Sequence, residues 1–538
     1  MRGEIVSDTY DYIVIGAGSA GCAVAARLSE DPQARVLLLE AGGRDRNPWI
    51  HIPVGYYRTM INPALTWRYE TEADDKVAER RLSWPRGRVL GGCSSVNGLL
   101  YVRGQHRDYD HWRQLGNPGW SYEDVLPYFR KAEDQERGAN EFHGSGGPLK
   151  VSDIPDRRPI CEAFIAAGQE LGIPGNSDFN GASQEGVGYF QTTSRRGRRS
   201  SAATAYLKPL RGRQNLNVVT RAHVSRLVVN EGRATGIVWL EGNAPRAAEC
   251  RGEIVLAGGA INSPQLLQLS GIGPGEVLRG LGIEVVRDMA GVGRDLQDHY
   301  QVRSIWEIRG ARSLNSDVHN PFLKVMIGMQ YALRRTGPLT ISAGQVGMFA
   351  RTRPELETPD IQFHFIPFSA EKPGQPLHRY AGVTSSVCQL RPESRGEVMI
   401  SSADHRQHPR IEANYLDTEV DRQTLIAGMK LNRRLSQTPA FAKYLKQERE
   451  PGEGYQSDEE LLRYARENGT TIYHPTSTCR MGPDDRAVVD ARLRVKGIAG
   501  LRVADCSIMP TLISGNTNAP AIMIGEKCAD MIKEDSRS

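Results

Sequence analysis

The sequence lacks several features that define whole classes of protein. Its 538 residues include only eight cysteines, and none forms a Cys-x-x-Cys pair or stands at metal-ligand spacing from a histidine. This usage is typical of free thiols in a reducing compartment, so we expect neither a disulfide framework nor a metal site. No apolar run reaches the ~18 residues that are needed to span a bilayer.

A strong charge of either sign is also missing. The 68 basic and 63 acidic residues leave a net charge of +5, which gives no argument for nucleic-acid binding. The densest basic run, Arg195 to Arg199, is interpreted as a solvated loop, with contact to an anion or a membrane surface as the alternative. The segment from Met1 to Asp11 is polar and has no apolar signal core. We therefore expect a cytoplasmic protein, either soluble or peripherally attached to a membrane, without a transmembrane segment.

The N-terminal region contains a strand–loop–helix–strand pattern. A short apolar strand over residues 12–15 is followed by the loop Gly16-Ala17-Gly18-Ser19-Ala20-Gly21 and by a helical pattern over residues 22–29. A second buried strand over residues 35–39 ends in Glu40. The order and length are those of a βαβ unit.

The residues of this unit are suited to binding a dinucleotide. Gly16 permits the tight turn, Gly18 allows the backbone to approach a pyrophosphate, and Gly21 allows the helix to pack closely on the strand. The helix begins near Ser19 and Ala20, where free amides face the phosphates, and Glu40 can accept hydrogen bonds from ribose hydroxyls. The pattern does not distinguish NAD from FAD, and a purely structural glycine turn is the alternative.

Further apolar strands occur far downstream, at residues 217–219, 227–229, 253–259 and 501–505. They predict a nucleotide-binding sheet assembled from separated pieces of chain. We expect this domain to comprise residues 1–155, 215–305 and 465–538. Residues 156–214 and 306–464, which are richer in proline and charge, would form the substrate-binding domain.

Three later segments carry a family resemblance. They are Pro85 to Gly98, Gly259 to Gly273, and a C-terminal pattern of Tyr473-His474-Pro475, Met481-Gly482, Asp505 and Gly515 to Asn518. In this order they resemble the signatures of the glucose–methanol–choline (GMC) oxidoreductase family, in particular its choline dehydrogenase-like alcohol dehydrogenases. The resemblance implies FAD as the cofactor and an α/β fold. In that fold a Rossmann-type FAD-binding domain is interleaved with a substrate-binding α+β domain on a second antiparallel sheet.

The first of these segments is expected to contact the flavin cofactor. Gly91 and Gly92 would let the loop press against the cofactor, and Arg88 could offset phosphate charge. Some relatives link FAD covalently through a histidine, whose place is taken here by Val96, so the flavin should be noncovalent. The resemblance further implies the cofactor contacts Asn97, Gly98, Val224, Asp505, Asn518 and Pro520.

His474 is the predicted catalytic base. An alcohol releases hydride as its hydroxyl proton leaves, and imidazole has a pKa suited to accepting that proton. The family places its base at this histidine, next to Tyr473, which we expect to contact substrate. Asn516 is the predicted partner, because an amide can bond the substrate oxygen without competing for its proton. A structural histidine and a turn asparagine are the alternatives.

The substrate prediction depends on Gln345. Choline enzymes hold the trimethylammonium group with a buried glutamate, and the matching position here is Gln345, which cannot neutralise a buried cation. His364 matches a further active-site histidine, with a solvent-facing strand histidine as the alternative.

The resulting expectation is FAD-dependent oxidation of a primary or secondary, uncharged alcohol to the carbonyl, with oxygen, a quinone or another carrier reoxidising the flavin. The alternatives are a choline-type dehydrogenase, a flavin-containing lyase or decarboxylase of the same fold, and a flavin-binding protein without alcohol chemistry.

Overall fold

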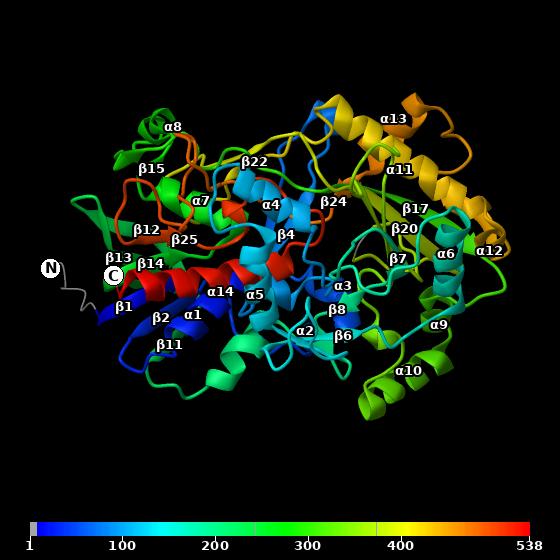
Figure 1. The fold of residues 1–538 in the computed structure, drawn as a ribbon, viewed down its shortest axis with the longest axis horizontal. Coiled ribbons are helices and arrows are strands. Elements are labelled where there is room, and N and C mark those ends of the chain that lie inside the picture. Colours follow the sequence, from blue (N-terminus) through cyan, green and yellow to red (C-terminus); the bar gives the residue numbers. More distant parts are fainter. Residues whose placement is uncertain (1–7, 243, 373, 538) are drawn as a thin grey trace.

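Two seven-stranded sheets form the two halves of the molecule, at the left and right of Figure 1. The computed structural model describes residues 8–242, 244–372 and 374–537, so most of the polar N-terminal segment, residues 1–7, lies outside the described residues. Within the described ranges, no helix combines the length and apolar character that crossing a membrane requires.

The first sheet is mainly parallel and is built from distant pieces of chain. Its strands in spatial order are β11 (Leu216–Thr220), β2 (Val36–Glu40), β1 (Asp8–Ile15), β14 (Ala244–Leu256), β13 (Arg233–Glu241) and β12 (Ala222–Asn230), and β25 (Leu501–Val503) also pairs with β14. All pairs among β11, β2, β1, β14 and β25 are parallel, and β13 joins β14 and β12 in antiparallel pairs. The predicted strands and their assembly into one sheet are confirmed.

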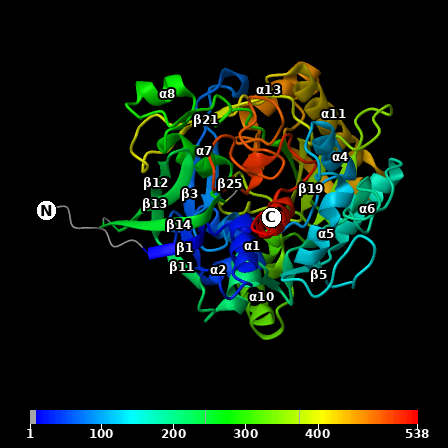
Figure 2. The same cartoon turned by 60° about the vertical axis from the view of Figure 1, so that its left-hand side comes forward.

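Two helices from opposite ends of the chain cover this sheet together. Helix α1 (Ser19–Leu28) follows the glycine loop, and α14 (Asn518–Asp535) lies beside it in both Figure 1 and Figure 2. The two backbones approach so closely that a Cβ on Gly525 would lie 2.5 Å from the carbonyl oxygen of Ala20. The last helix therefore positions its own first turn next to the glycine loop.

The second sheet is antiparallel throughout. Its strands in order are β23 (Leu445–Glu450), β17 (Tyr300–Ile308), β20 (Gly382–Gln389), β19 (Ile361–Ile366), β18 (Val346–Ala350) and β7 (Gly186–Tyr189), and β24 (Thr470–Thr471) also pairs with β17. The predicted fold class is confirmed. The boundary expected at residue 305 falls inside β17, so the strand that starts at Tyr300 belongs wholly to the second sheet.

The two faces of the second sheet have different neighbours. Helices α6 (Pro159–Glu170) and α11 (Glu419–Gln437) cover its outer face (Figure 1). Phe365 stacks on Phe164 of α6, with ring centroids 4.4 Å apart. Because side chains alternate along a strand, His364 faces the other way, toward the first half of the molecule.

The second glycine-rich segment lies where the halves meet. It follows the hairpin of β3 (Thr66–Glu70) and β4 (Ser83–Gly87) and contains the short helix η3 (Gly92–Ser95). A Cβ on Gly92 would lie 2.7 Å from the Cα atom of Gly18, so this loop packs directly on the first glycine loop. Two motifs about 75 residues apart in sequence thus form one surface, as expected for loops that accept close backbone contact.

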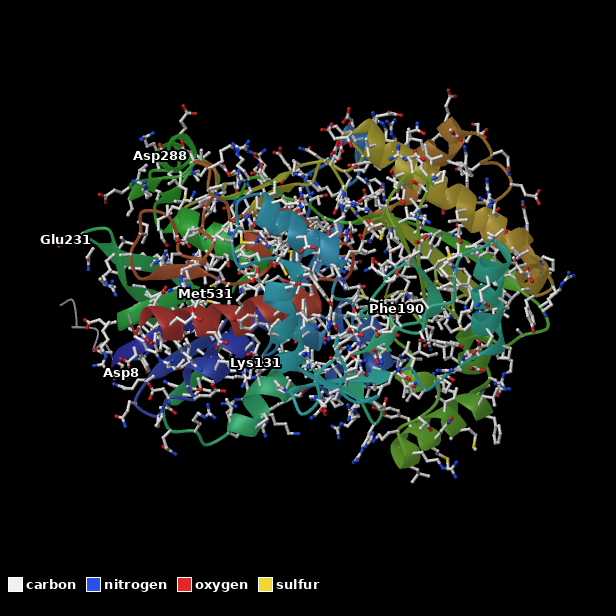
Figure 3. The ribbon with its side chains drawn as sticks, in the orientation of Figure 1. Asp8, Lys131, Phe190, Glu231, Asp288 and Met531 are labelled. Atoms are coloured by element: carbon white, nitrogen blue, oxygen red, sulfur yellow. The ribbon has the colours of Figure 1, made fainter. Side chains whose placement is uncertain are left out.

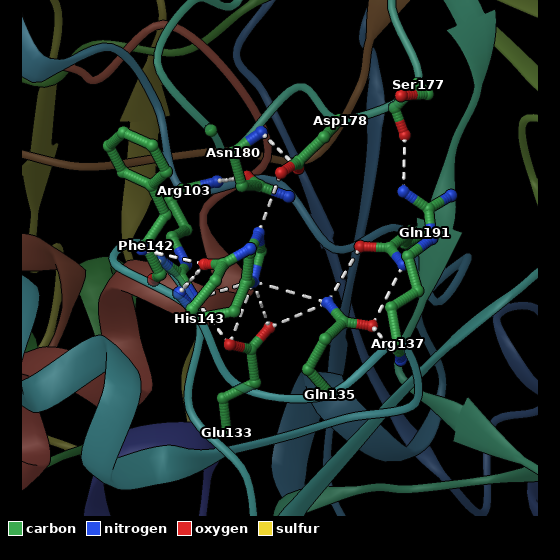
Figure 4. A network of polar contacts seen from close by, with 12 residues as sticks. Arg103, Glu133, Gln135, Arg137, Phe142, His143, Ser177, Asp178, Asn180 and Gln191 are labelled. Carbon is green, nitrogen blue, oxygen red and sulfur yellow. Dashed lines mark hydrogen bonds and ion pairs between the residues drawn. The ribbon is translucent and has the colours of Figure 1, made fainter.

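A buried polar network holds the segment that follows this loop (Figure 4). Arg103 pairs with Glu133 at 2.7 Å, and both side chains are almost fully buried. His143 bridges Glu133 at 3.0 Å and Asp178 at 2.9 Å. Burial favours neutral His143, but the hydrogen bonds to Asp178 and Glu133 outweigh burial and raise its pKa.

Replacing Glu133 with Ala should lower the free energy of unfolding by ~3–5 kcal/mol, because Arg103 and His143 lose their buried counter-charge. The raised pKa of His143 means that its contribution is complete below pH 6.5 and is lost as the pH rises through the folded-state pKa. Urea unfolding across pH measures both effects. Glu241→Ala, which breaks the exposed pair with Arg246, is the control and should cost less than ~1 kcal/mol. Equal effects of the two changes would contradict the prediction.

Candidate active site

Two adjoining cavities lie between the two sheets and share lining residues, so they form the two ends of one site. The end near the first sheet is lined by β1, the glycine loop, Glu40 and the start of α7 (Gly259–Leu269). The other end is lined by strands of the second sheet and by the segment that contains His474. The residues common to both ends are Ser19, Arg86, Cys93, Cys506 and Ala521.

The nucleotide-side end has walls made of backbone. Gly16 adopts φ +103°, and a Cβ there would lie 2.5 Å from the carbonyl oxygen of Ala257. A Cβ on Gly21 would lie 1.9 Å from the carbonyl oxygen of Gly16. Both positions therefore require glycine, for the reasons inferred from the sequence. Predicted cofactor residues that line this end are Gly16, Gly18, Ser19, Ala20, Glu40, Gly92, Val224 and Asp505.

Glu40 ends β2 with its carboxylate at the cavity wall. One oxygen accepts from the Ala17 amide at 3.1 Å and the other from the Gly42 amide at 2.8 Å. Burial raises the pKa of Glu40 to about 7, against the lowering effect of these hydrogen bonds. The oxygens retain free lone pairs for hydroxyl donors, and a bound donor would favour the ionised form.

Four predicted cofactor residues do not line the cavity. Arg88 lies with its guanidinium 4.3 Å from the ring centroid of Trp67, and the phosphate contact expected for it stays a prediction. Gly91 donates from its amide to the Ala17 carbonyl at 2.8 Å and holds the two glycine loops together. Gly21 acts through helix packing, and Pro520 is buried within the first turn of α14.

The opposite end brings together the residues expected to perform chemistry. Those that line it are Ser19, Asn97, Gly98, His364, Tyr473, His474, Asn516 and Asn518. They come from five separate stretches of chain. His364 is buried and stacks on Phe190, with centroids 5.6 Å apart, so it is not a solvent-facing strand residue. Phe190 lies in the interior at the right of Figure 3.

Gln345 does not line either end of the cavity. It lies just before β18, on the sheet face that carries His364, because Gly347 pairs with His364 and alternate residues share a face. Its side chain is fully buried and its amide nitrogen lies 3.4 Å from the Asp156 carbonyl oxygen. The amide nitrogen faces the Asp156 carbonyl and the buried Oε1 atom has no partner among the described residues, so the substrate contact expected at Gln345 stays a prediction.

The hydrogen bonds around His474 select one tautomer. The Nδ1 atoms of His299 and His474 lie 3.0 Å apart, and Nε2 of His299 lies 2.9 Å from the Leu390 carbonyl oxygen. A carbonyl only accepts, so the proton of a neutral His299 is on Nε2 and its Nδ1 is an acceptor. His474 must then carry its proton on Nδ1, which leaves its Nε2 unprotonated.

That bare Nε2 atom faces Asn516. The Nδ2 atom of Asn516 lies 3.2 Å from it, and Gln362 fixes the other end of the amide by donating to Oδ1 at 3.2 Å. Asn518 accepts from the Ser19 hydroxyl at 2.8 Å, while its buried Nδ2 atom has no partner in the part of the chain that is described. The cavity therefore contains one buried donor without a partner, on Asn518, while Nε2 of His474 accepts from the Asn516 amide.

Burial keeps His474 neutral. It lowers the pKa of His474 well below the usual value, and the neighbouring His299 and His364 and the charge of Arg86 lower it further. Burial likewise lowers the pKa of His299 to about 4, which supports the neutral ring assumed above. A neutral imidazole with an exposed lone pair can take a proton from a bound hydroxyl.

The backbone around His474 is held from both sides. Tyr473 adopts φ +68°, an uncommon value for a residue with a side chain, and its carbonyl accepts from Arg86 at 2.7 Å. The His474 amide donates to the buried Asp298 carboxylate at 2.6 Å. Sequence reasoning missed Arg86, Asp298 and His299. The only signal for the last two was an acid next to a histidine, which is too common to select them.

The remaining walls of this end are apolar and cationic. The apolar and aromatic residues are Tyr56, Tyr57, Met60, Leu99, Leu100, Ile366 and Phe368. Arg86, Arg303 and Lys372 are the charged residues, and no Asp or Glu is among the described residues that line this end. A cationic ligand would find no counter-charge in this wall.

Comparison with known proteins agrees with the fold and the cavity. Two family models, both described as GMC oxidoreductase, match residues 10–301 and 392–525. An alcohol dehydrogenase [acceptor] from Pseudomonas putida is 41% identical over 97% of this chain and 95% of its own length. Human mitochondrial choline dehydrogenase is 42% identical over 98% of this chain and 90% of its own.

A solved structure, pyridoxine 4-oxidase from Mesorbium loti, superimposes with a TM-score of 0.88 at 32% identity and covers 97% of this chain and 98% of its own. The fold that carries the glycine loops, the second sheet and the histidine-lined cavity is therefore shared with a solved structure. This chain is a member of the GMC oxidoreductase family of FAD-dependent flavoproteins that act on CH–OH groups.

Proposed function

We propose that the protein oxidises a primary or secondary, uncharged alcohol to the carbonyl, with His474 as the base. The observation that carries this proposal is the unprotonated Nε2 atom of His474, which faces the cavity beside Asn516. A substrate hydroxyl can donate to this nitrogen, and the Asn516 amide can hydrogen-bond the same oxygen as it becomes a carbonyl. The name of the Pseudomonas putida relative, alcohol dehydrogenase [acceptor], supports a separate electron acceptor that reoxidises the flavin.

FAD is held without a covalent bond in this proposal. The fit is supported by the glycine walls that exclude any Cβ, by the unpartnered Nδ2 atom of Asn518 and by the Glu40 carboxylate. Val96 lines the cavity, and a valine side chain has no atom that can form a bond to the flavin. When bound, FAD supplies the hydride acceptor.

Glu40→Gln should weaken FAD binding by about tenfold, because an ionised acceptor for the ribose hydroxyls is replaced by a neutral amide. Titration of apoprotein with FAD measures the dissociation constant, and acid precipitation of the wild type should leave all of its flavin in the supernatant. Glu249→Gln, at an exposed side chain of β14, is the control. Flavin that stays with the acid precipitate would contradict noncovalent binding, and unchanged affinity would remove Glu40 from the cofactor site.

The proton leaves the substrate toward a nitrogen that its neighbours hold in place. Asn516 is oriented by Gln362 and His474 by His299, so an entering hydroxyl has to displace only the hydrogen bond between Asn516 and His474. The Nδ1 proton of His474 remains on the His299 side as Nε2 gains the substrate proton. His299 is therefore a positioning residue for the base.

His474→Ala should slow anaerobic flavin reduction by an alcohol by about 10²–10⁴, the usual cost of losing a positioned base. Because the pKa of His474 is lowered, the base is neutral at pH 6.5, and the wild-type rate should decline only at more acidic pH. Stopped-flow absorbance across pH measures both. Reduction of the Ala variant at the wild-type rate would place the base elsewhere, with His364 as the next candidate.

The control for this experiment is at His299. A glutamine there can still accept from Nδ1 of His474, whereas a leucine cannot. His299→Gln should therefore retain more of the wild-type rate than His299→Leu, with similar KM values for the two variants. Equal losses would show that His299 acts only by filling space.

The substrate preference follows from the charges of the wall. An unpaired buried cation costs several kcal/mol, and the described lining offers Arg303 and Lys372 instead of a carboxylate. The wall of tyrosine, methionine, leucine and phenylalanine residues suits an aliphatic or aromatic alcohol. Because the chain is similar in sequence to choline dehydrogenases, choline is the second candidate substrate.

A neutral alcohol with the shape of choline, 3,3-dimethylbutan-1-ol, should show a kcat/KM for flavin reduction at least about a hundredfold above that of choline. Anaerobic bleaching of the flavin is the measurement, and it also tests the alternatives of a lyase or decarboxylase, which would not be bleached by alcohols. Efficient turnover of choline would overturn the proposed substrate class while leaving the assignment of the base intact.

A further inference from the structure

Helix α10 (Pro321–Arg334) exposes an apolar face that neither sheet covers. It lies at the lower edge of the molecule in Figures 1 and 2, away from both sheets. Of the nine large hydrophobic residues that are exposed in the described parts of the chain, five lie on this one helix. They are Phe322, Val325, Met326, Met329 and Leu333, and Phe322 and Leu333 are 71% and 80% exposed.

The five residues form one stripe on the exposed side of the helix, and Met326, Met329 and Leu333 also line an open groove between α10 and residues 156–159. Their spacing of three, one, three and four residues keeps them within a single helix face. Tyr331 projects from the opposite face, is buried, and donates from its hydroxyl to the Gly197 carbonyl at 2.8 Å. Asn320 caps the helix by accepting from the Phe322 amide at 3.0 Å. The helix is therefore anchored in the orientation that exposes its apolar side.

Exposed basic residues occur on α10 and on the segments at its two ends. Between residues 309 and 335 the basic residues Arg309, Arg312, Lys324, Arg334 and Arg335 are all exposed. The single acid in this range is Asp317, which is buried and paired with Arg158 at 3.0 Å and Arg312 at 2.6 Å. The flank of α10 thus has no exposed negative charge within this range.

The arginine run identified in the sequence adds to this surface. Arg195 and Arg199 are used inside the protein, where Arg195 donates to the Asp134 carbonyl and Arg199 to the Ile50 carbonyl. Arg196 and Arg198 are exposed on the turn between β9 (Ser194–Arg195) and β10 (Arg198–Arg199). Gly197, between them, is the residue that Tyr331 of α10 bonds. The two exposed arginines therefore lie beside the helix.

We propose that α10 and this arginine turn dock on the surface of an anionic lipid bilayer. An amphipathic helix with an apolar stripe and flanking cations lies in the plane of the interface, with its apolar side at the boundary of headgroups and acyl chains. Each Lys or Arg near an anionic surface adds about a fivefold gain in binding. A second copy of the chain is the poorer occupant, because a twofold contact would bring two cationic rims together.

The docking surface is tested by sedimentation of the holoenzyme with vesicles. Phosphatidylcholine vesicles that contain phosphatidylglycerol should carry the wild type down, and pure phosphatidylcholine should do so at least about tenfold less well. The variant Phe322→Ser/Met329→Ser/Leu333→Ser should lose at least about tenfold in partition coefficient. Lys324→Gln/Arg334→Gln should lose severalfold, and only with the anionic vesicles.

The matched control is Val286→Ser/Val420→Ser, which removes exposed apolar side chains from other elements. Its partitioning should equal that of the wild type, and all variants should retain wild-type flavin content and thermal midpoint. The proposal is overturned if the wild type ignores anionic vesicles or if the triple serine variant binds them equally well. If the wild type forms a dimer, the triple serine variant does not, and the wild type does not bind vesicles, then the stripe serves self-association and the proposal is overturned as well.

Discussion

The hydrogen bond between Nδ1 of His299 and Nδ1 of His474 is the contact on which the chemistry of the cavity depends. A buried histidine can carry its proton on either nitrogen, and only one choice leaves a lone pair facing the cavity. The Leu390 carbonyl makes that choice, because it forces the His299 proton onto Nε2. The Leu390 carbonyl thus sets the protonation of His474, although it contacts only His299.

Burial supports this arrangement and limits it. It lowers the pKa of His299 to about 4 and that of His474 well below its usual value, so both rings are neutral near pH 7. Nδ1 of a protonated His299 could not accept from Nδ1 of His474, so His474 would no longer be held with its proton on Nδ1. The Asp298 carboxylate and Arg86 fix the backbone on either side of His474 without bonding its ring.

The nucleotide end relies on a different constraint, which is the close approach of backbones. Gly16, Gly18, Gly21 and Gly92 lie where α1, β1 and η3 meet, and any side chain at Gly16, Gly21 or Gly92 would overlap a neighbouring main chain. This packing puts both glycine loops and the first turn of α14 on one wall of the cavity. The same closeness that excludes side chains leaves amides and carbonyls facing the space that FAD requires.

The sequence by itself determined the features that depend on neighbours along the chain. The βαβ unit, the glycine positions and Glu40 could be read because a strand, a turn and a helix leave local patterns. The resemblance then located His474 and Asn516, although it supplied no reason for their geometry.

Only the tertiary structure decided what those residues meet, since His299 and His474 are separated by 175 positions. Residue type and spacing do not reveal where a side chain points, and packing turned Gln345 toward Asp156 and Arg88 onto Trp67. Only the tertiary structure likewise placed Arg303 and Lys372 in the cavity wall and the apolar stripe of α10 at the surface. Which residues are exposed, and which are neighbours, is decided only when distant elements pack together.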